Sequence, residues 1–116
     1  FNVDNKDDWQ WTLMIVQPQM VTDSIFDEQL EIVTKKKKLN RLKYLRFTSY
    51  VEGKAAQIMH IGPFSEEGPT VQKIHDYIDQ KNYQRRGKHH EIYLSDIRRA
   101  DPANWKTVIR QPFKME

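Results

Sequence analysis

The alternation of apolar and polar residues in the run 88–96 is the feature that most restricts how this chain folds. Successive side chains of a β-strand point to opposite faces of the sheet, so Ile92 and Leu94 share one face. Glu91 and Tyr93 share the other face. We expect the apolar pair to pack against a helix, and the carboxylate and the phenol to face a pocket. The pattern also fits an amphipathic strand whose Glu91 and Tyr93 meet only water.

Residues 55–113 follow the order strand, helix, strand, strand. Alternation predicts a strand at 55–61 and a last strand at 105–111, stopped by Pro112 because proline cannot donate to a ladder. Between them, Val71, Ile74 and Ile78 recur at helical spacing and predict an amphipathic helix that ends near residue 82. Helices interspersed with antiparallel strands indicate the α+β class.

The first half of the chain carries weaker patterns. Residues 2–8 are polar and indicate a loop, and residues 9–17 alternate as a strand would. Thr22 is a good N-cap type and begins an amphipathic pattern, which predicts a helix over residues 22–37. Residues 44–51 predict a further strand, which forms a hairpin with residues 55–61 or one long strand bent at Gly53.

Aromatic residues accompany the predicted strands. Trp9 and Trp11 lie two positions apart and so share a face, and Tyr50 lies in the predicted strand 44–51. Such a surface attracts organic cations as well as apolar groups. The same residues also fit an ordinary core.

Length and composition set the broad class. A chain of 116 residues suits one domain, and without cysteine it has neither disulfides nor thiolate metal sites. No apolar run approaches the ~20 residues that span a bilayer, so we expect a cytoplasmic protein with no membrane partner. The chain opens on Phe1 rather than methionine, and we expect an upstream portion to be missing.

Several other classes of function find little support. The net charge of +3 is mild, and the lysines at 35–38 end a predicted helix, where cations favour the dipole, so we do not expect nucleic-acid binding. His89 and His90 are adjacent in a predicted strand and point to opposite faces, which disfavours chelation of one ion. No glycine-rich phosphate loop or nucleophile elbow is present. We expect neither a metal nor a cofactor.

Three ordered segments together resemble the GyrI-like small-molecule-binding family, in its stand-alone members. They are Met59-His60-Ile61-Gly62-Pro63-Phe64, then Glu91-Ile92-Tyr93-Leu94, and finally Trp105-Lys106-Thr107-Val108-Ile109-Arg110-Gln111-Pro112. The resemblance implies a sandwich of two strand–helix–strand–strand modules, with helices on one face of an antiparallel sheet and a ligand cleft between the modules. Residues 1–116 would then form a single domain, incomplete at its N-terminus. Residues 55–113 would be the second module, residues 9–17 the last strand of the first, and residues 22–37 an inserted helix.

The resemblance also implies a function. A glutamate at the centre of the cleft faces cationic aromatic ligands in the members that sense multiple drugs, and Glu91 occupies that position by motif. Tyr93 lies in the same motif, whereas Trp9, Trp11 and Tyr50 are placed in the ligand site by strand parity. We therefore expect a domain that binds hydrophobic cationic or electrophilic compounds, for sensing or detoxifying xenobiotics.

Two alternatives stay open. Some stand-alone members resemble hydrolases of cyclopropane-bearing natural products, which implies that Glu91 activates water, with Tyr50 as a second catalytic candidate. The family also includes a gyrase inhibitor, which implies a protein-interaction domain that binds an enzyme or pairs with itself as a homodimer. Binding and hydrolysis both need a partly buried acid among aromatic residues, so the residues alone do not separate them.

Overall fold

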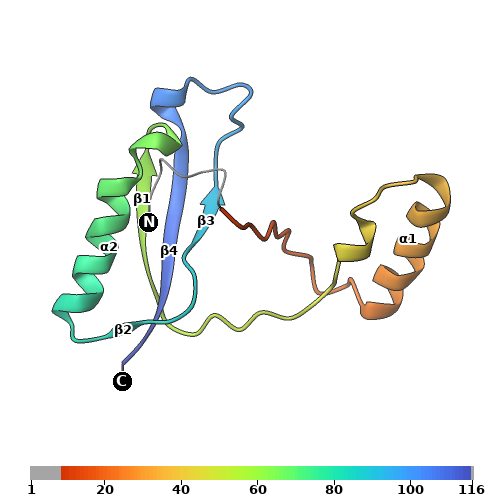
Figure 1. Cartoon of the computed structure of the whole chain (residues 1–116), viewed down its shortest axis with the longest axis horizontal. Helices are drawn as coiled ribbons and strands as arrows, with labels where there is room; N and C mark the ends of the chain where they lie inside the picture. Colours follow the sequence, from red (N-terminus) through yellow and green to blue (C-terminus); the bar gives the residue numbers. More distant parts are fainter. Residues whose placement is uncertain (1–8, 116) are drawn as a thin grey trace. The chain divides into compact units, whose positions relative to one another are not determined.

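The computed structural model describes residues 9–115 and divides the chain into two compact units (Figure 1). One consists of residues 10–50, and the other contains residues 51–115 together with Trp9. The polar loop expected at residues 2–8 lies outside the described residues. The chain is α+β, as predicted, and the four-stranded sheet belongs to the second unit.

The unit of residues 10–50 contains one α-helix, α1 (Asp23–Lys36), close to the predicted range. The hydroxyl of Thr22 accepts a hydrogen bond from the backbone N–H of Ile25, which caps the helix as its residue type predicts. No residue of α1 is buried, and the helix is followed by a single 3-10 turn at Leu42–Tyr44. Stacked rings of Phe26 and Phe47, with centroids 5.5 Å apart, pack the helix against the chain that follows it.

Two strands predicted in the first half of the chain are absent. Residues 9–17 and residues 45–51 form neither strand nor helix, although both alternate in sequence. An extended segment becomes a strand only when a neighbour takes up its backbone hydrogen bonds, and no described residue pairs with either segment. The predicted hairpin between residues 44–51 and 55–61 is therefore wrong.

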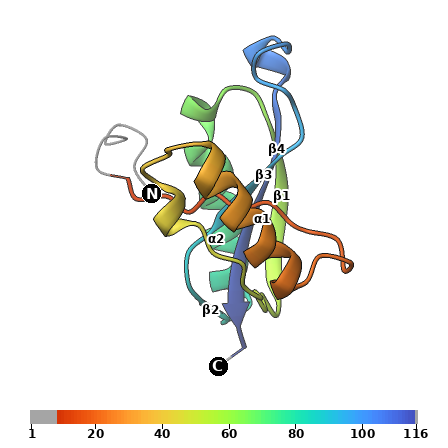
Figure 2. The ribbon, with the colours of Figure 1, turned by 90° about the vertical axis from the view of Figure 1, so that its right-hand side faces the viewer.

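The second unit is built on an antiparallel sheet. The central strand β4 (Lys106–Lys114) pairs on one side with β1 (Ala55–Ile61). On its other side lie β3 (His90–Tyr93) and β2 (Gln84–Arg85), the latter beside the C-terminal end of β4 (Figure 2). The strand at 55–61 is confirmed. Two short 3-10 turns, Phe64–Glu66 and Pro102–Asn104, complete the connections.

Strand β4 does not stop at Pro112, contrary to the prediction. The proline carbonyl accepts a hydrogen bond from the N–H of Arg86, 2.9 Å away. The next N–H, that of Phe113, donates to the carbonyl of Lys54, also at 2.9 Å. The ladder therefore loses only the one donor that proline lacks, and the strand runs on to Lys114.

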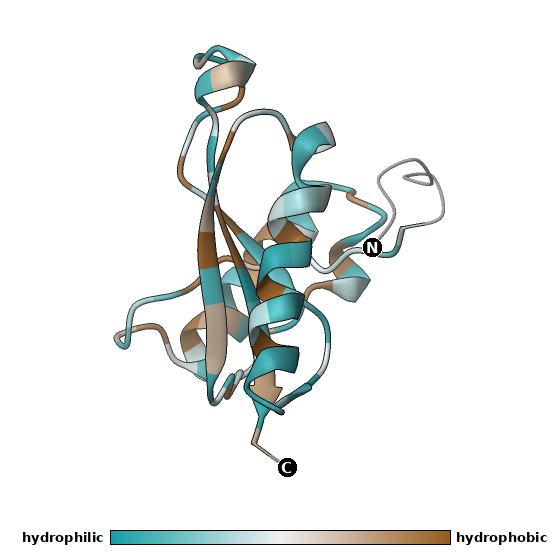
Figure 3. Cartoon of the chain, turned by 90° about the vertical axis from the view of Figure 1, so that its left-hand side faces the viewer, coloured by the Kyte–Doolittle hydropathy of each residue, from teal (hydrophilic) through white to brown (hydrophobic). Residues whose placement is uncertain are grey.

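Helix α2 (Gly68–Gln80) covers one face of this sheet, as its predicted stripe requires. Val71, Ile74 and Ile78 are buried against Ile109 of β4, and these four residues form the apolar core. The solvent-facing side of the helix is mainly hydrophilic (Figure 3). Because antiparallel partners share a face, the side chains in register with Ile109 also lie on the helix side.

Candidate ligand-binding site

Glu91 and Tyr93 lie on the helix-covered face of the sheet. Glu91 is the register partner of the buried Ile109, and Tyr93 is the partner of the buried Thr107. This corrects the expected orientation of the strand, in which Ile92 and Leu94 pack against a helix. Those two side chains lie on the opposite, helix-free face and are 38% and 54% exposed. Alternation assigned residues correctly to two faces, but it could not tell which face the helix covers.

The Tyr93 phenol is coupled to the carboxylate of Glu91. Partial burial raises the pKa of Tyr93 to about 12, and the charge of Glu91 and its hydrogen bond with the phenol add to this, followed by the charge of Glu67. The phenol therefore keeps its proton at neutral pH and acts as a donor. His89 lies on the other side of Glu91, with Nε2 3.9 Å from Oε1. Burial lowers the pKa of His89, and Glu91 partly opposes that effect.

Three aromatic rings form a wall beside this pair. The ring of Phe64 lies 5.4 Å from that of Tyr93 and 4.9 Å from that of Trp105, centroid to centroid. Trp105 is held in place because its indole N–H donates to the carbonyl of Ala100 at 3.0 Å. A carboxylate next to a tilted aromatic cluster can attract an organic cation and stack its apolar part.

Sequence reasoning did not single out Phe64, Glu67 or Trp105 as site residues. Phe64 begins the turn that leads to α2, Glu67 directly precedes the helix, and Trp105 directly precedes β4. Only the pairing of β3 with β4 and the position of the helix bring these three residues to Tyr93. Phe64 and Trp105 lie within the resemblance motifs and Glu67 follows one of them, and this was the available signal.

The structure shows no contact of the remaining predicted site residues with Glu91. Trp11 and Tyr50 belong to the unit of residues 10–50 and are 71% and 58% exposed. Trp9 belongs to the same compact unit as the sheet and is half-buried. The structure thus brings Glu91 and Tyr93 together, and the contribution of the three others stays a prediction.

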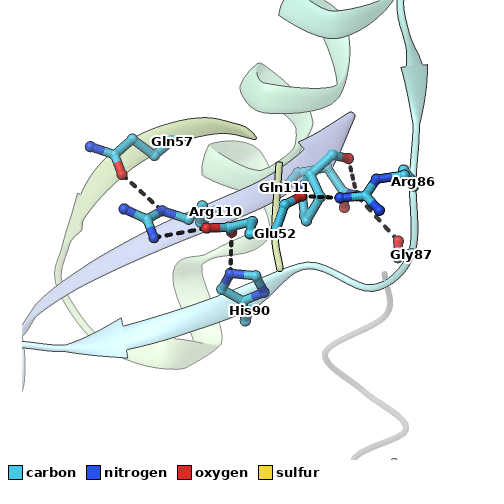
Figure 4. Close-up of polar contacts among 8 residues, drawn as sticks. Glu52, Gln57, Arg86, Gly87, His90, Arg110 and Gln111 are labelled. Atoms are coloured by element: carbon cyan, nitrogen blue, oxygen red, sulfur yellow. Dashed lines mark hydrogen bonds and ion pairs between the residues drawn. The ribbon is translucent and has the colours of Figure 1, made fainter. Parts of the chain in front are cut away.

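A second polar cluster lies on the helix-free face (Figure 4). The carboxylate of Glu52 contacts Nε2 of His90 and, at 3.1 Å, the guanidinium of Arg110. Arg110 in turn donates to the amide oxygen of Gln57 at 3.0 Å, and Arg86 donates to the backbone carbonyl of Glu52. These contacts fasten the segment before β1 onto β3 and β4. The geometry indicates a structural role for the cluster, because the Glu52 carboxylate is paired with both His90 and Arg110.

Comparison with known families decides what this arrangement belongs to. The model of the GyrI-like small molecule binding domain matches residues 17–114. The chain belongs to this family. Its α+β sheet with a covering helix agrees with that assignment.

Solved structures of GyrI-like relatives support the fold. A crystal structure of an uncharacterised conserved protein from Listeria innocua shares 37% identity with a TM-score of 0.76, covering 84% of this chain and 50% of that one. A crystal structure of a hydrolase from the same organism shares 35% identity with a TM-score of 0.73, covering 84% of this chain and 52% of that one. Another hydrolase structure from Listeria innocua has 35% identity and a TM-score of 0.72, covering 84% of this chain and 50% of that one. A comparison with curated proteins found no match.

The chain thus spans about half the length of these GyrI-like relatives. Among residues 9–115, no group of three or more histidine, cysteine, aspartate or glutamate side chains is arranged to hold a metal ion. Within the same range, no helix is long and apolar enough to cross a membrane.

The Tyr93 phenol is expected to titrate near pH 12 in this GyrI-like domain. The ordinary pKa of a tyrosine is 10.0, so between pH 10 and 12 the unfolded chain loses the Tyr93 proton while the folded chain keeps it. The contribution of Tyr93 to the free energy of unfolding is therefore fully present below pH 10 and is lost as the pH rises from 10 through 12. The measurement is the difference between the ultraviolet titration curves of wild type and of Tyr93→Phe. The Glu91→Gln variant should move the Tyr93 step part of the way back toward 10, since burial remains. A Tyr93 step already at pH 10 in wild type would contradict the coupling.

Proposed function

We propose that this domain holds hydrophobic, cationic or electrophilic small molecules around Glu91, for sensing or detoxifying xenobiotics. The observation that carries the proposal is the Glu91 carboxylate, bonded to the Tyr93 phenol and lying beside the aromatic cluster of Phe64, Tyr93 and Trp105. A carboxylate supplies attraction to a cation, and the rings supply stacking area and cation–π contact. Membership of a small-molecule-binding family supports the same conclusion.

The chemistry of the residues supports an aromatic or cationic ligand. Glu91 is largely buried but not sealed, with a side chain 18% exposed, so a ligand can reach it without displacing the core. Partial burial lowers the effective dielectric and strengthens the attraction between the carboxylate and a cation. Tyr93 is about half-exposed, so its ring is accessible to the same ligand.

A second candidate function is hydrolysis of strained electrophiles such as cyclopropane-bearing compounds. Two relatives from Listeria innocua at 35% identity are described as hydrolases, which favours this candidate. In this mechanism Glu91 accepts a proton from the attacking water, and the protonated Tyr93 phenol donates to the oxygen on which negative charge develops. This chain covers about half of each hydrolase, so the proposal concerns only that half.

Binding of benzyltrimethylammonium tests the first proposal. Isothermal titration of wild type and of Glu91→Gln is expected to show at least about a tenfold weaker affinity in the variant, because an ion pair of this kind contributes ~1.4 kcal/mol or more in a partly buried site. The matched control is Asp79→Asn, which removes one negative charge from the exposed far end of α2. Equal affinities in Glu91→Gln and wild type would rule out Glu91 as the cation site.

A further inference from the structure

The stretch from residue 32 to residue 51 carries basic residues and no acidic ones. Seven exposed cations lie in it: Lys35, Lys36, Lys37, Lys38, Arg41, Lys43 and Arg46. The four acidic residues of the same compact unit all lie earlier, within residues 23–31. The unit of residues 10–50 therefore has a positive end, which begins at the last turn of α1.

Most of these charges are not neutralised within the described part of the chain. Lys35 forms an ion pair with Glu31 at 3.0 Å, and no carboxylate of residues 9–115 lies within ion-pair distance of the other six cations. The dipole of α1 accounts for Lys35 and Lys36, which lie in its last turn. Its effect falls off beyond that turn, so it does not explain why the basic stretch continues through Lys38 and Lys43.

A groove lies where the chain turns back beside α1 after the helix ends (Figure 1). The backbone N–H of Lys37 donates to the carbonyl of Val33 at 2.9 Å, and that of Leu42 donates to the carbonyl of Leu39 at 3.3 Å, which fixes the turn. The groove has a volume of about 480 Å³, which falls within the range of small-molecule sites. Three leucines and three lysines are among its lining residues: Leu30, Leu39, Leu42, Lys37, Lys38 and Lys43.

The lining of this groove combines two kinds of chemistry. Leu30 and Leu42 are partly buried and Leu39 is 54% exposed, so the three leucines offer apolar surface that a ligand would remove from water. The lysine ammonium groups are donors that carry positive charge, and a groove lined by charges of one sign raises the local concentration of counter-ions. Together these features favour an anion that has an apolar body.

We propose that the groove at the end of α1 binds a small amphiphilic anion. Its carboxylate, sulfonate or phosphate lies among Lys37, Lys38 and Lys43, and its apolar body lies against the three leucines. This site belongs to the unit of residues 10–50 and takes ligands of the opposite charge to those expected at Glu91. The inference therefore does not depend on the function proposed for Glu91.

Three probes separate the contributions of charge and apolar surface: naphthalene-2-sulfonate, the uncharged naphthalene-2-sulfonamide, and methanesulfonate, which has the charge without the rings. Isothermal titration of the chain in about 0.15 M salt, where charges are screened beyond ~8 Å, is expected to show saturable binding of naphthalene-2-sulfonate. The sulfonamide and methanesulfonate should each bind at least about tenfold more weakly, because each lacks one of the two interactions.

Two double variants with the same change of charge test the position of the site. Lys37→Gln with Lys38→Gln is expected to weaken naphthalene-2-sulfonate about tenfold, since each exposed ion pair contributes about two- to fivefold. Lys35→Gln with Lys36→Gln removes two neighbouring charges that do not line the groove, and it should change the affinity less than about twofold. Glu91→Gln should leave this affinity unchanged.

Other results would overturn the inference in distinguishable ways. Equal losses in the two double variants would show a diffuse basic surface, of the kind that binds nucleic acids and other polyanions, instead of a groove. Equal affinities for the sulfonate and the sulfonamide would show that the lysines do not recognise the charge. Loss of binding in Glu91→Gln would place the probe at the other site. Absence of saturable binding to wild type would exclude the groove as a ligand site and would leave the function proposed for Glu91 untouched.

Discussion

Hydrolysis of an aryl cyclopropyl ketone is expected to be about 10²–10⁴-fold slower in Glu91→Gln than in wild type, the usual contribution of a positioned general base. As the water oxygen bonds to a ring carbon, its proton passes to Glu91. The strained C–C bond breaks, and its electron pair moves to the enolate of the ketone. The enolate oxygen accepts a hydrogen bond from Tyr93, whose raised pKa keeps the phenol protonated, and the enolate carbon is then protonated to give a hydroxyketone. Glutamine cannot accept the water proton.

Product formation is followed by mass spectrometry as the gain of one water per substrate. Asp79→Asn should retain full activity, since it changes charge by the same amount at the far end of α2. Tyr50→Phe tests the second predicted catalytic residue, which the structure does not place relative to Glu91. Turnover in Glu91→Gln at the wild-type rate would remove Glu91 from the chemistry. Binding by wild type without any product would identify the domain as a sensor or a sequestering module.

Replacement of Ile109 by alanine is expected to lower the free energy of unfolding by about 2–5 kcal/mol. Ile109 is fully buried on the central strand and contacts the helix side of the sheet, where only Val71, Ile74 and Ile78 are equally buried among the described apolar residues. A core this small has few neighbours that could move to fill the cavity, which favours the upper part of the range. Urea denaturation followed by circular dichroism gives the measurement.

Ile92→Ala is the matched control, because it makes the same side-chain truncation on the neighbouring strand. Ile92 is 38% exposed on the helix-free face, so its loss should cost less than about 1 kcal/mol. Comparable losses from the two substitutions would place Ile92 in a core and would contradict the register of β3 against β4. The pair therefore tests the face assignment on which the site depends.

The elements that could be predicted from sequence are those whose pattern is local and whose partners lie nearby. The stripe of Val71, Ile74 and Ile78 predicted α2, and the N-cap type of Thr22 marked the beginning of α1, because capping and helical periodicity depend on residues within a turn or two. The strand at 55–61 was predicted with its observed bounds. The family motif located Glu91 on a strand, which β3 confirms.

The predictions that were wrong all depend on long-range strand pairing. Residues 9–17 and 44–51 alternate as strands do, yet alternation does not supply the neighbouring strand whose hydrogen bonds would fix them. The same limit reversed the orientation of β3, since the side on which α2 packs is decided by Ile58 and Ile109 rather than by Ile92. Whether residues 9–17 complete a first module, with Trp9 and Trp11 in its cleft, stays a prediction.

The contacts of Glu52 with His90 and Arg110 also protect the site on the far side of the sheet from a misaligned strand. If β3 slipped by one residue so that Glu91 faced Arg110, its carboxylate would meet that of Glu52, and two negative charges would compete for one guanidinium. A slip in the other direction would set the imidazole of His90 against the buried Ile109. Both slips in register would destabilise the sheet. The contacts of Glu52 with His90 and Arg110 therefore help to keep the carboxylate of Glu91 on the face of the aromatic cluster, although they lie outside the proposed ligand site.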